Sequence, residues 1–400
     1  MNRRHAWALA LVATFTMAIS YVDRQVVAVL APTITADLRI DETSYGLLAS
    51  AFSLAYLVGA PIAGRIIDRV GARRGLLGAV LVWSAVAALH AVVPGFAVLF
   101  ALRIALGFAE APSFPGAAQT VHRALPPEDR ARGFGVLFTG SSIGAMIAAP
   151  LATAIDARFG WRVAMIVTAI VGLIWVPLWL SFAWSRQGRA ALDRHDPTPG
   201  SKPPPMREIL RHRAVLRAMV VVFASAPTIA FVLLWGSKFL VRTYGLTQAQ
   251  VGHYLWLPPL AFDAGAVIFG DLASRRRAEG PPRALFATAT LLSLAVGLVP
   301  LARGPWSGLA LAGVALAGGG GLFALLTSDM PARVPKDAVS LAGGITAAAQ
   351  SLAYVVANPL IGRSVQATGQ YTNALVALAL WTVPGCLLWL WWRPPPRHPA

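Results

Sequence analysis

Apolar runs of about 20 residues recur along this chain, separated by short polar or Pro/Gly-rich segments. A helix of ~20 apolar residues is long enough to cross the ~30 Å hydrocarbon core of a bilayer. We expect twelve such spans, beginning at Ala6, Tyr45, Gly75, Phe96, Arg132, Trp161, Ala214, Val251, Ala284, Ser307, Val339 and Thr372. With 56% hydrophobic and 13% charged residues, the composition exceeds what the core of a soluble domain needs. The sequence therefore predicts an all-α membrane protein with twelve transmembrane helices.

The basic residues are distributed unequally between the two sides of these spans. With both termini inside, the inner segments hold twenty-five Lys and Arg residues and the outer segments hold five, Arg39, Arg158, Arg162, Arg242 and Arg303. An excess of cations on the cytoplasmic side is the usual rule for membrane proteins. The net charge of +17 therefore indicates orientation and not a nucleic-acid partner. We expect a multi-pass protein of a bacterial inner membrane with both termini in the cytoplasm.

Several other functional classes find no support in the sequence. Arg3 and Arg4 precede an apolar run, as in a signal peptide, but no small-residue cleavage site follows, so this run is predicted to be the first span. The single cysteine, Cys386, permits no internal disulfide and no thiol-based metal site. The seven histidines lack metal-ligand spacing and receive no role. A membrane enzyme would need a nucleophile beside a base at membrane depth, and the sequence shows no such combination. No metal or cofactor is expected.

A polar, proline-rich stretch divides the chain into two halves. We predict a six-helix bundle over residues 1–184, a cytoplasmic linker over 185–213 and a second six-helix bundle over 214–400. A shift of 206 residues places Gly64 on Gly270, and Arg69 on Arg275. An internal repeat of six spans is typical of transporters whose halves rock about a central site.

Seven ionisable residues fall inside the predicted spans, where such groups are costly unless they pair or line a wet cavity. They are Asp23, Arg24, Arg103, Glu110, Lys238, Asp263 and Arg363. Arg103 and Glu110 are seven residues apart and so share one helix face, roughly 10 Å apart along the axis. Gly107 lies between them on that face and leaves room for a ligand or a neighbouring helix.

Two interpretations of these charges remain open. In the first, Arg103 and Glu110 only pair with Arg24 and Asp23 and hold two spans together. In the second, an anionic substrate takes an arginine, the carboxylate loses its partner and picks up a proton, and substrate and proton cross together.

Several short motifs in the sequence resemble those of a known superfamily. The loop "GRIIDRVGARRG", residues 64–75, matches the GxxxDRxGxR loop between helices 2 and 3 of the major facilitator superfamily. Within that superfamily, the chain resembles the anion:cation symporter family, which includes bacterial hexuronate, galactonate and glucarate transporters. The resemblance is carried by "YVDRQVVAVLAPTI", Tyr56, "RIALGFAEAPSFPG" and "LPPEDRAR". The resemblance implies proton-coupled uptake of a small organic anion by alternating access, in a monomer that needs only substrate, protons and membrane lipid. Sodium in place of the proton remains open.

The resemblance also implies site residues. Asp23 and Glu110 match the proton-linked carboxylates, Arg24 and Arg103 the substrate or charge-partner arginines, and Tyr56 a cavity tyrosine. In the second half, Trp235 falls where these carriers often have a tryptophan. The loop motif implies a conformational gate formed by Gly64, Asp68, Arg69, Gly71 and Arg73.

The second half departs from the family pattern. In "WGSKFL", Ser237 stands where proline is usual, and Lys238 is an extra cation that either binds the substrate or reaches the outer headgroups. Asn358 either offers its amide to substrate hydroxyls or packs between helices. The main alternative function is export of a drug or metabolite, since importers and exporters share this fold. A non-transporting sensor is a further alternative.

Overall fold

The computed structural model describes residues 2–193, 205–276, 282–335, 338–393 and 395, and every regular element in these residues is helical. Within them, eleven helical segments are long and apolar enough to cross a membrane. These are Arg3–Val29, Glu42–Val70, Ala72–Val92, Phe96–Ala124, Pro127–Phe159, Trp161–Ala183, Arg213–Tyr244, Arg283–Leu301, Pro305–Arg333, Leu341–Thr368 and Thr372–Trp391. They correspond to all the predicted spans except the one beginning at Val251.

The exception is α14, Leu257–Ser274, which begins six residues later than predicted. Pro258 and Pro259 follow directly, and a proline disfavours helical geometry in the residue before it and donates no backbone hydrogen bond. Prolines are tolerated in the first turn of a helix, so the helix begins here and a turn joins it to the short α13, Gln248–Val251.

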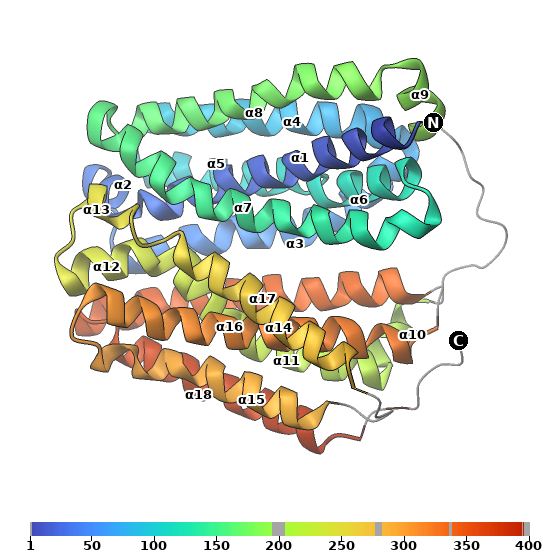
Figure 1. The fold of residues 1–400 in the computed structure, drawn as a ribbon. Helices are drawn as coiled ribbons and strands as arrows, with labels where there is room; N and C mark the ends of the chain where they lie inside the picture. The colour runs from blue at the N-terminus through green and yellow to red at the C-terminus, as the bar shows by residue number, and fades with distance from the viewer. Residues whose placement is uncertain (1, 194–204, 277–281, 336–337, 394, 396–400) are drawn as a thin grey trace. The chain divides into compact units, whose positions relative to one another are not determined.

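The chain forms two compact units (Figure 1). Unit 1 comprises Met1–Pro197 and Gly245–Trp256, and unit 2 comprises Thr198–Tyr244 and Leu257–Ala400. Unit 1 holds α1 Arg3–Val29, α2 Ala31–Asp37, α3 Glu42–Val70, α4 Ala72–Leu89, η1 His90–Val92, α5 Phe96–Glu110, α6 Ser113–Ala124, α7 Pro127–Phe159, α8 Trp161–Ala183, α9 Arg186–Leu192 and α13. Unit 2 holds α10 Met206–Arg211, α11 Arg213–Ala230, η2 Phe231–Trp235, α12 Gly236–Tyr244, α14, α15 Arg283–Ser293, η3 Leu294–Leu301, α16 Pro305–Asp329, η4 Pro331–Arg333, α17 Val339–Thr368 and α18 Thr372–Trp391.

Several of the described spans change helix type or break along their length, and in two of them this happens beside a predicted site residue. The fourth is divided between α5 and α6 at Ala111 and Pro112, directly after Glu110. The seventh contains a π-helical turn, η2, which ends at Trp235. Such turns are rare and often lie at functional sites.

Close helix packing accounts for the glycine between Arg103 and Glu110. A methyl group on Gly107 would lie 2.6 Å from the carbonyl oxygen of Phe52 on α3, and 2.7 Å from the Cβ of Ala55. The space that Gly107 leaves is therefore filled by a neighbouring helix, which settles the choice between helix and ligand at this position.

The segment predicted as the linker contains two short helices, α9 and α10. Asp193, the C-cap of α9, accepts two hydrogen bonds from Arg73 at 2.9 and 2.7 Å, so α9 is fastened to unit 1. Arg194, His195 and Lys202 lie outside the described residues, as do Arg277, Lys336, Arg397 and His398.

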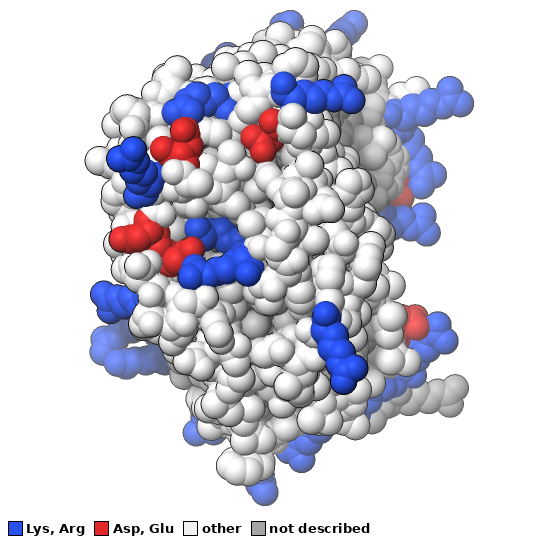
Figure 2. Space-filling model, turned by 90° about the vertical axis from the view of Figure 1, so that its left-hand side faces the viewer, with Lys and Arg blue, Asp and Glu red and all other residues white. Residues whose placement is uncertain are grey.

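Figure 2 views the end of the molecule that carries α2 and α13 of unit 1. Acidic and basic side chains lie close together in that upper part of the view, and they do not form an unbroken basic area. At the end of α2 and the start of α8, Arg162 Nη1 and Asp37 Oδ2 form an exposed ion pair at 2.6 Å.

Candidate functional site

A buried ion pair joins α1 to α5 in unit 1. Arg24 donates from Nε to Glu110 Oε2 at 2.6 Å, and the hydroxyl of Ser20 donates to the same oxygen at 2.8 Å. Glu110 is fully buried, and the Arg24 side chain keeps 15% of its surface exposed. Charge-assisted hydrogen bonds of this kind are roughly twice as strong as neutral ones. Because Ser20 and Arg24 are four residues apart, one face of α1 supplies both donors.

Aromatic rings surround the two arginines. The guanidinium carbon of Arg24 lies 4.5 Å from the centre of the Tyr56 ring, 4.9 Å from Tyr21 and 5.0 Å from Phe52. Arg103 lies 5.2 Å from the same Phe52 ring. Each distance is within the range of a cation–π interaction. Phe52 thus contacts both guanidinium groups and holds them near each other.

Arg24 and Arg103 each have a hydrogen-bond donor without a partner among the described residues. Within the part of the chain that the structure describes, Nη2 of Arg24 and Nη1 of Arg103 are buried without a hydrogen-bond partner, and so is Oε1 of Glu110. A buried donor without a partner costs free energy, more so when it is charged. A carboxylate that accepts from these two nitrogens would remove that cost.

Asp23 differs from Glu110. It is 4% exposed, and neither carboxylate oxygen accepts a hydrogen bond of normal geometry among the described residues, although the indole nitrogen of Trp83 lies near the carboxylate. Arg103 and Glu110 lie within electrostatic range of it. Among the described residues Glu110 therefore pairs with Arg24 and not with Arg103, and Asp23 has no ion pair of its own.

Two members of this site, Ser20 and Phe52, are uncharged, so the pattern of ionisable residues in the spans does not reveal them. Helical spacing was the available signal, since Phe52 lies four residues before Tyr56 and their rings stack with centres 6.0 Å apart.

The predicted residues of the second half lie in unit 2. Trp235 donates from its indole nitrogen to Oδ1 of Asn358 at 2.9 Å, and the Asn358 amide donates to the carbonyl of Tyr354 at 2.8 Å. Both side chains are fully buried, an arrangement that suits helix packing. Lys238 is 8% exposed, so protein encloses a side chain that was alternatively expected to reach the headgroups.

The predicted gate residues surround the turn between α3 and α4. Gly71 has φ +82°, a conformation that side chains rarely adopt, and it links the two helices. Asp68 and Arg69 are exposed, and Asp68 accepts a hydrogen bond from Gln119 at 3.4 Å. Arg73 is buried and binds Asp193. Gly64 has open space around its α-carbon.

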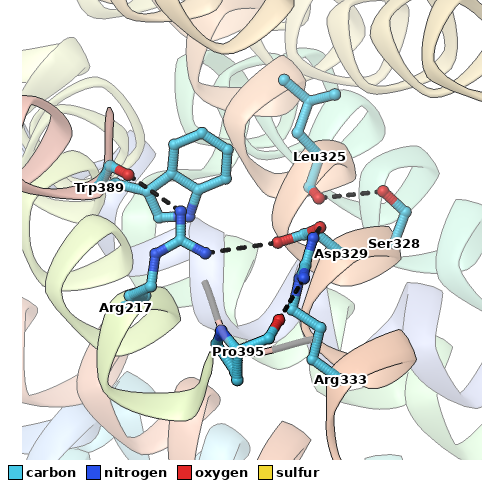
Figure 3. Close-up of polar contacts among 7 residues, drawn as sticks. All are labelled: Arg217, Leu325, Ser328, Asp329, Arg333, Trp389 and Pro395. Carbon is cyan, nitrogen blue, oxygen red and sulfur yellow. Dashed lines mark hydrogen bonds and ion pairs between the residues drawn. The ribbon is translucent and has the colours of Figure 1, made fainter. Parts of the chain in front are cut away.

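A second buried charge cluster lies in unit 2 (Figure 3). Arg333 donates to Oδ1 of Asp329 at 3.0 and 2.7 Å, and Arg217 lies 3.7 Å from the other oxygen. Arg217 also donates to the carbonyl of Trp389 at 2.9 Å, and Arg333 donates to that of Pro395. These contacts fasten the end of α18 and the residues after it to α11, α16 and η4, and so give the cluster a structural role.

Comparison with known proteins identifies relatives of the whole chain. The profile of the Major Facilitator Superfamily matches residues 13–357. A hexuronate transporter of Bacillus subtilis is 28% identical, over 90% of this chain and 87% of that protein. A D-galactonate transporter of Escherichia coli O6:H1 is 27% identical, over 96% and 94%. A hexuronate transporter of Escherichia coli K12 is 25% identical, over 94% and 93%.

Solved structures share the fold. A bacterial homologue of the human lysosomal transporter Spinster, in an inward-facing and unoccupied conformation, superposes with a TM-score of 0.76, covering 98% of this chain and 97% of that one. The sequences are 16% identical, so the likeness concerns the fold alone.

Proposed function

The chain belongs to the Major Facilitator Superfamily, and from this premise we propose that it carries a small organic anion, a sugar acid or another carboxylate, across a membrane together with a proton. The family consists of transporters, so the chain is not an enzyme. The curated relatives support a sugar-acid substrate, since their names are those of hexuronate, galactarate/glucarate and galactonate transporters.

The proposal includes the membrane topology. We place α14 as the eighth of twelve spans, because its 18 residues, about 1.5 Å each, nearly cross the hydrocarbon core. Units 1 and 2 then each contribute six spans, and the unequal distribution of arginines puts both termini in the cytoplasm of a bacterial cell. The protein acts as a monomer without a cofactor, and a proton gradient, or a sodium gradient, supplies the driving force.

An anionic substrate is supported by the two guanidinium groups, those of Arg24 and Arg103, that lie over the Phe52 ring. Arg24 and Arg103 each have a buried nitrogen without a partner. A substrate carboxylate that accepts from these nitrogens satisfies both arginines, and Tyr56 is close enough to Arg24 to contact the same ligand. A cationic substrate would face two positive charges, which argues against an exporter of cationic drugs.

The Arg24–Glu110 pair supplies the coupling. In the described conformation, Arg24 compensates the charge of Glu110 at 2.6 Å. A substrate anion that binds Arg24 weakens this bond, and a carboxylate without its partner in a low-dielectric site then takes up a proton. The substrate thereby promotes protonation of Glu110, so the two are carried together.

Uptake into proteoliposomes tests the proposal. We would measure radiolabelled glucuronate, galacturonate, galactonate and glucarate, with an inward proton gradient and without one. Glu110→Gln should abolish gradient-driven accumulation and retain counterflow, because the amide keeps the shape of the carboxylate and carries no proton. The exposed Glu128 of α7 provides the control Glu128→Gln, which should behave as the wild type.

Arg103→Ala tests the anion site in the same assay. It should raise the half-saturating substrate concentration about tenfold or more, because a hydrogen bond to a charged group contributes roughly 1.5–3 kcal/mol. Transport of neutral or cationic compounds with no uptake of any acid would overturn the proposal and favour an exporter. Uptake that a sodium gradient stimulates and a proton gradient does not would leave the anionic substrate in place and make sodium the coupling ion.

A further inference from the structure

A small cavity adjoins Asp23 inside unit 1. Its volume is about 10 Å³, room for roughly one water molecule. The residues that line it come from α1, α4, η1, α5 and α8, and they are Asp23, Val27, Ala87, His90, Leu106, Met165 and Thr168. Three of them are polar, so the cavity differs from the apolar voids that remain dry.

His90 presents a hydrogen-bond acceptor that nothing in the described residues fills. Its Nδ1 lies 2.8 Å from the carbonyl oxygen of Val86, which only accepts, so Nδ1 carries the proton in the neutral ring. Nε2 is then a lone-pair acceptor, and it is buried without a partner in a side chain that is 1% exposed. A histidine held in this tautomer is suited to pass a proton through Nε2.

The other two polar groups complete the coordination of one water. Asp23 has two carboxylate oxygens without partners. Thr168 donates its hydroxyl proton to the carbonyls of Ala164 and Met165, at 3.0 and 3.1 Å, and its oxygen keeps a lone pair free to accept. All three groups are acceptors while Asp23 is ionised and His90 is neutral, so a water, which has two protons, donates to two of them at a time.

We propose that this cavity binds a water molecule that joins His90 to Asp23, and that the three form a proton relay to the transport site. When Nε2 carries a proton, it donates that proton to the water while the water gives one of its own protons to the Asp23 carboxylate, and the reverse transfer returns a proton from Asp23 to Nε2. The ring returns to its neutral form with the Nδ1 proton unchanged, so the bond to Val86 persists throughout. The relay rests on the proposed proton-coupled function.

The position of His90 gives the relay a direction. His90 lies at the end of α4 opposite Gly71, and Val92, two residues later, is 73% exposed. If the loop at Gly71 faces the cytoplasm, the His90 end faces outside, where an inward gradient supplies protons. Arg103 lies within electrostatic range of both Asp23 and His90, and Glu110 within range of Asp23. The positive charge of Arg103 opposes a lasting charge on His90, so the ring passes the proton on and does not store it.

Two variants test the relay in proteoliposomes. His90→Gln keeps a hydrogen-bonding side chain that carries no proton, and Ala87→Val fills the cavity while leaving His90 and Asp23 intact. Both should slow gradient-driven uptake roughly tenfold relative to substrate exchange, because a positioned proton-transfer group commonly contributes at least that much. Two exposed positions of unit 1 provide controls, His253→Gln and, on the same helix as Ala87, Ala85→Val. Wild-type rates in both test variants would overturn the relay and leave the symport proposal intact.

A measurement without transport separates the two proposals. In protein labelled with ¹⁵N-histidine in nanodiscs, we would assign the His90 signals by their loss in His90→Gln. The Nε2 resonance should shift in Asp23→Asn and in Ala87→Val, and remain unchanged in Ala85→Val. If the chemical shift of Nε2 is the same in Asp23→Asn as in the wild type, no water connects His90 to Asp23, whatever the uptake assay shows. Absence of proton-driven uptake in the wild type, by contrast, would refute the proposed function and the relay together.

Discussion

Gly319 and Gly320 are neighbours on α16, yet a methyl group would meet very different surroundings at the two positions. On Gly320 it would clash with the carbonyl oxygen of Phe262 on α14, and would lie 2.9 Å from the carbonyl carbon and 3.0 Å from the backbone nitrogen of Ala266. On Gly319 its nearest neighbours are side-chain carbons of Ile229 at 3.7 and 3.8 Å, an ordinary contact. We therefore expect opposite effects from Gly320→Ala and Gly319→Ala.

The magnitudes follow from two opposing contributions. Replacing glycine by alanine inside a helix is worth about 1 kcal/mol in favour of the folded state. Overpacking costs about 1–3 kcal/mol, and here the upper part of that range applies, because backbone atoms cannot turn aside as a side chain can. Gly320→Ala should destabilise unit 2 by about 1–2 kcal/mol, and Gly319→Ala should be neutral or stabilise it by up to about 1 kcal/mol.

The chain contains its own reporter for this measurement. Cys386 is the single cysteine, it is fully buried, and it belongs to the same core cluster as Phe269 of α14 and Leu322 of α16. A thiol-reactive fluorophore should label it only when unit 2 unfolds. At about 2–4 °C per kcal/mol, the labelling midpoint of Gly320→Ala should lie several degrees below that of Gly319→Ala. Equal midpoints, or the reverse order, would show that α14 and α16 do not pack as closely as described.

Two further predictions concern arginine contacts. Arg24→Lys keeps the charge but loses the planar group that binds Glu110 and lies over Tyr56, so substrate affinity should fall about tenfold in a binding titration; unchanged affinity would assign Arg24 a role as a simple point charge. The contacts from Arg162 at 2.6 Å and from the Trp161 indole at 3.1 Å hold the pKa of Asp37 below its usual range. Their contribution to stability is therefore present at neutral pH and is lost as the pH falls below about 4, through the lowered pKa. A thermal scan followed by tryptophan fluorescence should show a steeper loss of stability below that pH in the wild type than in Asp37→Asn; parallel pH profiles would contradict the assignment.

The pattern of charges in the spans was enough to single out the four ionisable residues around the Arg24–Glu110 pair, but not the pair itself. Asp23, Arg24, Arg103 and Glu110 stand out because ionisable residues are rare at membrane depth, and the spacing of Arg103 and Glu110 follows from the helical repeat. Periodicity does not reveal which carboxylate pairs with which arginine, because that depends on how α1 is rotated against α5. The structure joins Arg24 to Glu110 and leaves Asp23 without an ion pair.

His90 shows why other parts of the site escaped prediction. It is one of seven histidines, it ends an apolar span, and it has no charged neighbour in the sequence. Its relation to Asp23 arises only when α1, α4 and α8 pack around a common cavity, and no local pattern encodes that contact. Pro258 and Pro259 indicate that α14 begins late, whereas the length of the apolar run alone predicts an earlier start.

Asp23 and Glu110 of unit 1 are unequal, and this inequality bears on the two interpretations of the buried charges. A purely structural quartet would set each carboxylate against an arginine, since an unpaired buried charge weakens the packing that it is meant to hold. Instead, Glu110 receives two hydrogen bonds on one oxygen, and Asp23 receives none and adjoins a cavity lined by His90 and Thr168. Glu110 is thus placed to respond to whatever binds Arg24, and Asp23 is placed to exchange protons with a water. On the proposed mechanism Glu110 takes up a proton when an anion engages Arg24, and Asp23 exchanges protons with the cavity water, and these two roles give a reason for ionisable groups at this depth that helix packing alone does not provide.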